Sequence, residues 1–438
     1  MKRRMIALLV AVLALSLILG ACTPAATPAP APTKPPATAV PAATEPPAPA
    51  KVSQRLPGKL EGMSWDDVLA AADGQEVNWW MWGGSEVIND WVKGTVAPRL
   101  KELYNITLNQ VPVATPQEFI NTVLGEKEAG KHDGGAVDIM WINAENFKTM
   151  KRGDLLYGPF AQQIPSAQYV TWDERVTFDA GFPTDGYEMP LWNCFAVFGY
   201  DSAKAQFPQI VPLDDLFAWI TENPGRFSYP VASEFVGSMF VRHVCHATTG
   251  GYEQYMAPFD QAVFDEKFPA CWEKLNEIEP YLWREGETYP ESNSAAYGLL
   301  GSGDTWVQPA TCQGGFQAGI GSGLYPETTR SFALENSSEA AANYMAIAYN
   351  SAHLAASVVA ANWFESPEGQ YSAAIAHKQF PTIDMALLPA EWAEKFAAVD
   401  YGPAILPIDV LQANGVPMIV SDWWVPTEEG WVANVLQK

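Results

Sequence analysis

The sequence predicts an α/β protein with two lobes, and two observations carry this prediction. After Gly74 the chain alternates between strand-like and helix-like segments, which is typical of an open parallel sheet covered by helices. From residue 59 to residue 438 the composition is that of a folded chain, and this length exceeds what one hydrophobic core usually holds.

The first elements follow directly from the local pattern. A continuous apolar run over residues 77–82 predicts a buried strand, and Ser85 is placed to cap the helix that follows. Residues 106–113 predict the second strand. Thr115-Pro116-Gln117-Glu118 then has the form of a capping box with proline at the first helical position, which predicts the start of another helix.

A third strand over residues 137–142 ends beside Asn143, which we expect to cap a short helix. Ligands of such sheets lie beyond the carboxyl ends of the strands, where helices begin, so the loops after the first and third strands are candidate binding loops. The alternative is that their tryptophans belong to the core and their glycines only turn the chain. The candidate residues are Trp82, Gly83, Gly84, Ser85, Trp141, Asn143 and Asn146.

The chain begins like an exported lipoprotein. Three basic residues at positions 2–4 precede a short apolar stretch that ends in Leu19-Gly20-Ala21-Cys22. We expect residues 1–21 to be a signal peptide and Cys22 to be lipidated, with an ordinary signal and a chance cysteine as the alternative. The expected location is the extracytoplasmic face of the cell membrane, at the cell surface or in the periplasm.

Residues 22–58 form a predicted disordered linker. Eleven prolines and ten alanines between residues 23 and 57 leave little that could build a core, whereas all seventeen tryptophans lie beyond residue 64. No later stretch approaches twenty apolar residues, so we expect the lipid to be the sole attachment to the membrane.

The protein is strongly acidic. Lys and Arg together number 26 and Asp and Glu number 50, and removal of the signal peptide leaves 23 bases against 50 acids. This charge argues against nucleic acid as a partner. It suits the solubility of an exported protein, and attraction of cationic ligands is a weaker inference from it.

After Cys22, the remaining cysteines predict two disulfides in an oxidising compartment, with three pairings open. They are Cys194, Cys245, Cys271 and Cys312. A metal site at His243, Cys245 and His246 is the alternative. Since no fourth ligand follows at a recognisable spacing, we predict no metal, and nothing in the sequence indicates a cofactor.

Few catalytic signatures occur. Gly125–Lys131 has the spacing of a phosphate loop, but His132 stands where a hydroxyl should bind magnesium. Asp185 and Glu188 could be the carboxylate pair of a glycoside hydrolase, or could hydrogen-bond a ligand instead. We therefore expect a binding protein and not an enzyme, with a surface-tethered carbohydrate hydrolase as the alternative.

Several long segments resemble the extracellular solute-binding proteins of ABC importers (family 1-like), and more closely the YnjB-type periplasmic components. The segments include WWMWGGS (79–85), GGAVDIMWINAENFKTMKRGDLLYGP (134–159), FPTDGYEMP (182–190) and FVGSMF (235–240). The resemblance runs over most of residues 76–390.

The resemblance implies a periplasmic-binding-protein-like type II fold, in which two α/β lobes joined by crossing hinge strands close on a solute. It places the first crossing within Asp185–Phe198 and the return over Trp306–Cys312. It also implies that Cys194 pairs with Cys312 and Cys245 with Cys271. The implied lobes are residues 59–186 plus 312–349 (N-terminal) and residues 187–311 plus 350–438 (C-terminal).

The resemblance adds ligand contacts outside the strand-end loops. Asp185, Glu188 and Gly237-Ser238 match the family pattern, and the last pair would open a helix of the second lobe that faces the first. Where relatives tend to have Asn-Pro, this chain has Thr311-Cys312-Gln313, and Gln313 remains a candidate contact.

We therefore expect a monomeric, lipid-anchored solute-binding protein that passes a small solute to an ABC permease and its ATPase. Tryptophans with carboxylates favour a flat organic cation such as thiamine, whereas helix N-termini favour a phosphate or carboxylate. A phosphorylated cation would satisfy both. A ligand-sensing lipoprotein is a further alternative.

Overall fold

The computed structural model describes residues 56–336 and 338–438. The predicted signal peptide, Cys22 and all but the end of the predicted linker lie outside these residues, so those predictions stay predictions. Leu56, near the end of that linker, is 2% exposed and packs in the core around the first sheet.

Within the described residues the first lobe is built on a seven-stranded sheet with the central order β13-β12-β3-β1-β2, while β4 and β7 also pair with β12. β1 pairs in parallel with β2 and β3, which confirms the alternation predicted after Gly74. The sheet is mixed and not purely parallel, because β12 runs antiparallel to β3, β4 and β7. The strands are β1 (Glu76–Trp82), β2 (Thr107–Val113), β3 (Ile139–Ile142), β4 (Leu156–Tyr157), β7 (Glu188–Phe195), β12 (Ser338–Ala348) and β13 (Gly415–Pro417).

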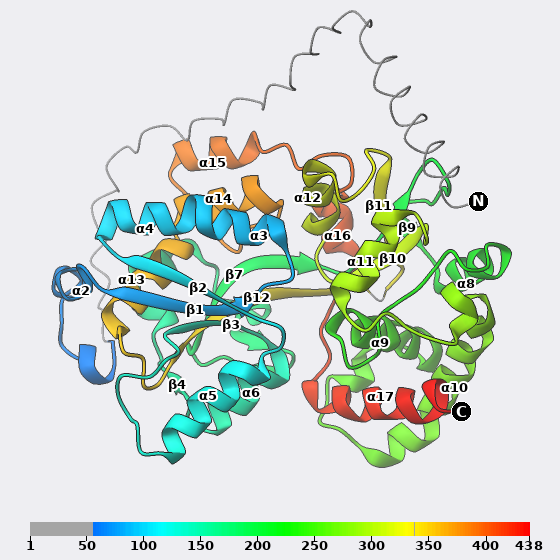
Figure 1. The fold of residues 1–438 in the computed structure, drawn as a ribbon, viewed down its shortest axis with the longest axis horizontal. Coiled ribbons are helices and arrows are strands. Elements are labelled where there is room, and N and C mark those ends of the chain that lie inside the picture. Colours follow the sequence, from blue (N-terminus) through cyan, green and yellow to red (C-terminus); the bar gives the residue numbers. More distant parts are fainter. Residues whose placement is uncertain (1–55, 337) are drawn as a thin grey trace, which may run out of the picture. The chain divides into compact units, whose positions relative to one another are not determined.

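Helices cover both faces of this sheet (Figure 1). One face carries α2 (Trp65–Ala72), α3 (Glu86–Trp91), the π-helical turn η2 (Val92–Val96), α4 (Ala97–Tyr104), α13 (Leu354–Phe364) and α14 (Pro367–His377). The other carries α5 (Gln117–Glu128) and α6 (Ala144–Arg152). Both faces of β1 are therefore covered, which is why its sequence is apolar from Trp79 to Trp82.

Local capping signals have mixed outcomes. The Ser85 hydroxyl accepts the Ile88 N–H at 3.4 Å, so the predicted N-cap of α3 is confirmed. At α5, the Glu118 carboxylate accepts the N–H groups of Ala114 (2.8 Å) and Thr115 (3.3 Å), but the Thr115 hydroxyl makes no capping bond. Half of the predicted capping box is thus present.

The second lobe is built on a four-stranded sheet with the order β10-β8-β11-β9. Its strands are β8 (Val197–Asp201), β9 (Ile210–Val211), β10 (Val307–Ala310) and β11 (Thr329–Leu334). Around it lie α8 (Leu213–Glu222), α9 (Phe235–Thr249), α10 (Gln261–Ile278), α11 (Asn293–Ser302), α12 (Gly314–Ser322) and α17 (Trp424–Trp431). Shorter elements are α7 (Glu174–Thr177), β5 (Phe178–Asp179), β6 (Phe182–Pro183), α15 (Ala390–Ala397) and α16 (Ile408–Asn414).

The chain passes between the sheets through paired strands. It leaves the first sheet where β7 is followed by β8, within the predicted segment 185–198, and returns where β11 is followed by β12. The prediction of a return over Trp306–Cys312 is wrong. Residues 307–310 form β10, which pairs antiparallel with β8 inside the second sheet, so its hydrogen bonds keep it there.

The packing of two helices bears on the lobe boundaries. α13 and α14 fall within residues 350–438, which we expect in the C-terminal lobe, yet residues of both belong to the core of the seven-stranded sheet. Likewise β7, within residues 187–311, pairs in that sheet. The boundaries stay predictions.

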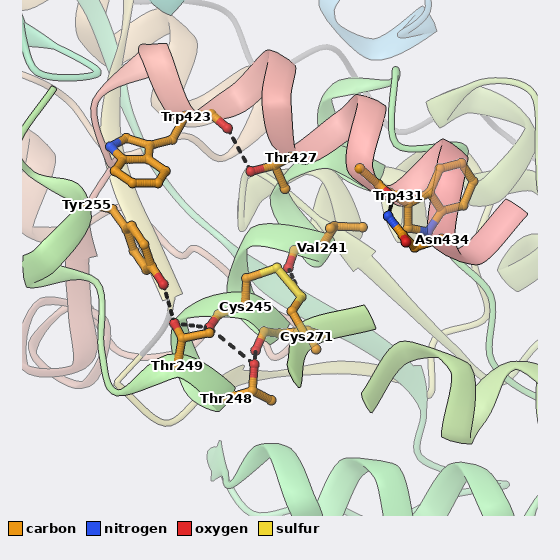
Figure 2. The surroundings of a disulfide bond; sticks show 12 residues. Val241, Cys245, Thr248, Thr249, Tyr255, Cys271, Trp423, Thr427, Trp431 and Asn434 are labelled. Carbon is orange, nitrogen blue, oxygen red and sulfur yellow. Dashed lines mark hydrogen bonds between the residues drawn. A yellow bond between two sulfur atoms is a disulfide. The ribbon is translucent and has the colours of Figure 1, made fainter. Parts of the chain in front are cut away.

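Two disulfides join segments as the resemblance implies. Cys194 of β7 is bonded to Cys312, two residues after β10, and Cys245 of α9 is bonded to Cys271 of α10. Figure 2 shows the second, where the Thr249 hydroxyl donates to the Cys245 carbonyl at 2.6 Å and is itself bonded to the Tyr255 hydroxyl. The rings of Trp423 and Tyr255 pack edge to face with their centroids 4.9 Å apart. The residue just before α17 therefore lies beside the side chains around this disulfide.

The disulfides should differ in their contribution to stability. The Cys194–Cys312 bond spans 118 residues and the Cys245–Cys271 bond spans 26, so loss of the first should lower the free energy of unfolding by about 1 kcal/mol more than loss of the second. Urea unfolding of the two double Cys→Ser variants measures the difference. Four alkylatable thiols among these cysteines in the unreduced, unfolded protein would contradict both bonds.

Candidate functional site

The ends of β1 and β3 bring two tryptophans together. The rings of Trp82 and Trp141 meet edge to face with their centroids 6.4 Å apart. The loop after β1 needs its glycine, since a Cβ on Gly84 would lie 2.3 Å from the Trp82 ring and 2.8 Å from the Ser294 hydroxyl. That hydroxyl, on α11 of the second lobe, donates to the Gly84 carbonyl at 3.3 Å. The strand end therefore also contacts the other lobe.

Asn343 of β12 completes this group, and sequence reasoning missed it. Its Oδ1 accepts from Trp141 Nε1 at 2.8 Å and from Asn143 Nδ2 at 3.3 Å, and its Nδ2 lies 2.9 Å from the Cys194 sulfur. One amide thus joins the end of β3 to the disulfide between Cys194 and Cys312. A lone polar residue after three alanines, Ala340–Ala342, was the available signal.

Asn143 does not cap α6, contrary to prediction. It occupies the N-cap position without a side-chain capping bond, because its Oδ1 accepts the backbone N–H of Tyr344 at 3.1 Å. The Ala144 N–H is bound by the carboxylate of Asp179 instead. Asn146 lies nearby on α6, where its Oδ1 accepts from Gln117 Nε2 at 3.2 Å and its Nδ2 donates to Glu145 Oε1 at 3.1 Å.

Gly237 and Ser238 lie inside the first turns of α9, which begins at Phe235. A Cβ on Gly237 would come within 2.3 Å of the carbonyl oxygens of Pro230 and Val231, so glycine lets the helix pack on that loop. Ser238 is 2% exposed; its hydroxyl donates to Glu428 Oε1 and accepts from Arg242 Nη1, both at 2.6 Å.

Arg242 is neutralised by the crossing strand. Its Nε and Nη2 bind the two carboxylate oxygens of Glu339 in β12 at 2.8 and 2.7 Å, and both side chains are buried. Its guanidinium lies over the Trp424 ring, 3.9 Å from the centroid. This arrangement satisfies the guanidinium charge, so we do not expect it to be free to hold an anion.

Glu145 of α6 faces this cluster from the first lobe. Its buried Oε2 has no hydrogen-bond partner within the described part of the chain. Burial, with a smaller repulsion from Glu428, raises the pKa of Glu145 to about 7, although Arg242 opposes the shift. Burial likewise raises the pKa of Glu428. The two lobes therefore present two carboxyl groups to each other beside a guanidinium that is already paired.

We define two groups from these contacts. The strand-end cluster is Trp82, Trp141, Asn143, Glu145 and Asn343, and the α9 cluster is Ser238, Arg242, Trp424 and Glu428. A pocket of about 260 Å³ lies beside Glu145, between α6 and residues 421–425 at the start of α17, and an ion pair of Lys148 with Asp422 crosses the same boundary.

Three other candidates lie elsewhere. Asp185 is exposed and binds Lys151 at 2.6 Å. Glu188 is fully buried, both of its oxygens lack partners, and burial raises its pKa well above the usual range. Gln313 is also fully buried; its amide accepts from the Phe195 N–H at 2.8 Å and donates to the Asn193 carbonyl at 3.2 Å. The Gln313 side chain is thus bound to the backbone of β7. Because Glu188 is fully buried, a polysaccharide could not contact it.

The sequence matches the family of bacterial extracellular solute-binding proteins over residues 95–399. The chain belongs to this family. Protein YnjB of Escherichia coli (strain K12) is 30% identical over 309 residues, which are 70% of this chain and 78% of that protein. The resemblance drawn from the sequence is therefore confirmed.

Solved solute-binding proteins share the fold. The spermidine/putrescine ABC transporter substrate-binding protein PotD from Streptococcus pneumoniae has a TM-score of 0.57 at 12% identity, over 82% of this chain and 98% of that chain. An ABC transporter substrate-binding protein from Bradyrhizobium japonicum has a TM-score of 0.59 at 13% identity, over 82% and 99%. AfuA from Actinobacillus pleuropneumoniae, with fructose-6-phosphate bound, has a TM-score of 0.53 at 11% identity, over 82% and 98%.

The solute-binding protein thus has the two-lobed type II periplasmic-binding-protein fold, as predicted. Its family consists of extracellular solute-binding proteins, which act outside the cytoplasm, and the solved proteins named above share its fold. None of the helices in the described part of the chain combines the length and the apolar character that a bilayer crossing requires.

The raised pKa of Glu145 predicts a pH-dependent contribution to stability. Between its ordinary value of 4.5 and about 7, the unfolded chain ionises this group and the folded protein does not, so stability falls as pH rises through this window. Glu145→Gln should therefore change the free energy of unfolding little at pH 4 and raise it by about 3 kcal/mol at pH 8. Urea unfolding at both values measures this, and Glu429→Gln, on the exposed surface of α17, is the matched control. Equal gains at both pH values would contradict it.

Proposed function

We propose that the chain is a lipid-anchored, monomeric solute-binding protein of an ABC importer that captures a small organic cation between the strand-end and α9 clusters. The lobes would separate to admit the solute, close on it, and then deliver it to the permease and its ATPase. A type II fold with both clusters at the contact between its lobes supports this proposal.

The charge balance of the two clusters carries the choice of a cation. Burial raises the pKa of Glu145 and of Glu428 although Arg242 opposes both shifts, and Arg242 itself is bound by Glu339. A cation placed between the two carboxyl groups would stabilise their ionised forms. A phosphate would instead meet acidic groups and a guanidinium that is already paired.

The tryptophans favour a cation that carries a flat ring or methylene groups. Trp82 and Trp141 supply aromatic surface at the strand ends. Thiamine and related compounds have such a ring and charge. The name of PotD, a neighbour in fold, associates it with spermidine and putrescine, which are cationic amines. We therefore place thiamine and polyamines first among the candidate solutes.

A ligand screen by thermal unfolding tests this proposal. Thiamine, its phosphates, putrescine, spermidine, amino acids and sugars would each be added to the purified protein, and a cation should raise the unfolding temperature, since a ligand at one hundred times its Kd contributes about 2.7 kcal/mol. Trp141→Ala should remove the shift. Trp392→Ala, a half-buried tryptophan of α15, is the matched control and should keep it. A shift with sugars alone would contradict the cation assignment.

The lipid anchor is tested separately. In cells that make the full-length chain, Cys22→Ala should move the protein from the membrane fraction to the soluble extracytoplasmic fraction, because the tether has lost its attachment site. Immunoblotting of the fractions measures the change. Binding of solute by the released protein should be unchanged, and an unaltered membrane fraction would show that Cys22 is not the anchor.

The surface-tethered hydrolase and the ligand sensor are the other function classes. The hydrolase requires Asp185 and Glu188 to flank a glycosidic bond, but Asp185 is exposed beside Lys151 and Glu188 is buried. Absence of carbohydrate turnover in the wild type and in Glu188→Gln would agree with the binding function. Loss of uptake when a cognate permease is deleted would favour transport over sensing.

A further inference from the structure

The molecule has a second, larger cavity beside the crossing strands. Its volume is about 1210 Å³, and β7 contributes Asn193–Phe195 to its wall while β12 contributes Ala340–Ala342 and Tyr344. The wall also includes segments from α7, β5, α15, α16 and β13 and the residues 380–385. The members of the strand-end and α9 clusters do not line it. Cavities of several hundred Å³ are large enough to hold a drug-sized molecule, so this one has ample room.

Exposed apolar side chains gather where the cavity meets solvent. Phe178, Met256, Met385 and Ile408 all line it and are 44%, 38%, 37% and 38% exposed. They come from four separate segments: β5, the turn before α10, the turn at residues 385–387 and the start of α16. Apolar residues that meet around a cavity are characteristic of binding surfaces.

One buried acid lines the cavity, and a second lies near that acid. Asp179 lines the cavity at 2% exposure; one of its oxygens binds the Ala144 N–H, and Oδ1 has no partner among residues 56–336 and 338–438. The fully buried Glu188, whose oxygens also lack partners, is close enough to Asp179 to feel its charge. Burial raises the pKa of Asp179 to about 8, which is the response of an acid that lacks a cation beside it.

The lining is acidic overall. Asp173, Glu174 and Asp384 accompany Asp179, whereas Arg175 is the one basic residue among those that line the cavity, and its guanidinium is bound by Asp173 at 2.7 Å. The wall also carries the aromatic rings of Tyr344 and Phe396 and others. Aromatic faces and unpaired carboxyl groups together suit a cation with a large apolar body.

We propose that this cavity is a second binding site, distinct from the contact between the lobes, and that it takes an organic cation with a bulky apolar body. The charged centre lies on the Asp179 side, and the apolar groups contact the exposed side chains at the opening. Because β7 and β12 form part of the wall, the bound molecule touches the strands that connect the lobes.

The test compares two ions of the same shape and opposite charge. Isothermal titration calorimetry of the full-length protein with tetraphenylphosphonium should show one ion bound per protein molecule. The Kd for tetraphenylborate should be at least tenfold higher. Asp179→Asn should weaken phosphonium binding at least tenfold. Ile408→Lys, which puts a positive charge at the opening, should do the same, whereas Leu124→Lys on α5, at 39% exposure, is the matched control and should leave the Kd unchanged.

The variants also separate this site from the proposed solute site. Ile408 is exposed, so its variant remains informative if Asp179→Asn does not fold. Trp141→Ala should leave phosphonium binding unchanged. Equal affinity for the two ions or an unchanged Kd in Ile408→Lys would overturn the proposal. Loss of phosphonium binding in Trp141→Ala would also overturn it, because it would show that the ion binds at the strand-end cluster.

Discussion

The structure depends above all on the antiparallel pairing of β7 with β12. β7 leads into the second sheet and β12 leads out of it, so these two connections between the lobes belong to one hydrogen-bonded unit. The Cys194–Cys312 disulfide and the Gln313 amide fix a third segment to it, and Glu339 of β12 holds Arg242 of α9. Any closure of the lobes must therefore occur about this unit, as expected for hinge motion in binding proteins.

The same strand decides the electrostatics of the contact between the lobes. A buried guanidinium must be paired, and Glu339 pairs it from the hinge side. Burial then raises the pKa of both Glu145 and Glu428, and the nearby Arg242 opposes the shift in each without cancelling it. A cation that entered there would favour ionisation of Glu145 and Glu428. The preference for a positively charged solute therefore follows from the pairing of Arg242 with Glu339.

Sequence reasoning predicted the candidate site unevenly, and the reason differs from residue to residue. Trp82 lies at the carboxyl end of β1 and Trp141 at that of β3. The two tryptophans could be placed together because β1 and β3 were predicted to be parallel strands, whose carboxyl ends share one edge of a sheet. Asn343 was missed because it lies about 200 residues from the groups that it binds. Glu188 matched the family pattern and Gln313 stood where this chain departs from it, but neither observation states burial, and both residues proved to be fully buried.

By itself, the sequence determined the alternation of strands and helices in the first lobe, the Ser85 cap, the even number of cysteines after Cys22 and the acidic balance, because each depends on neighbours in the chain or on composition. Only the tertiary structure decided that β10 stays in the second sheet, that β12 carries the return, and which carboxyl groups are buried without a partner. These features rest on contacts between residues that are often a hundred or more positions apart. Local propensity does not determine such contacts. They are determined by which strands pair and which side chains are buried when the whole chain folds.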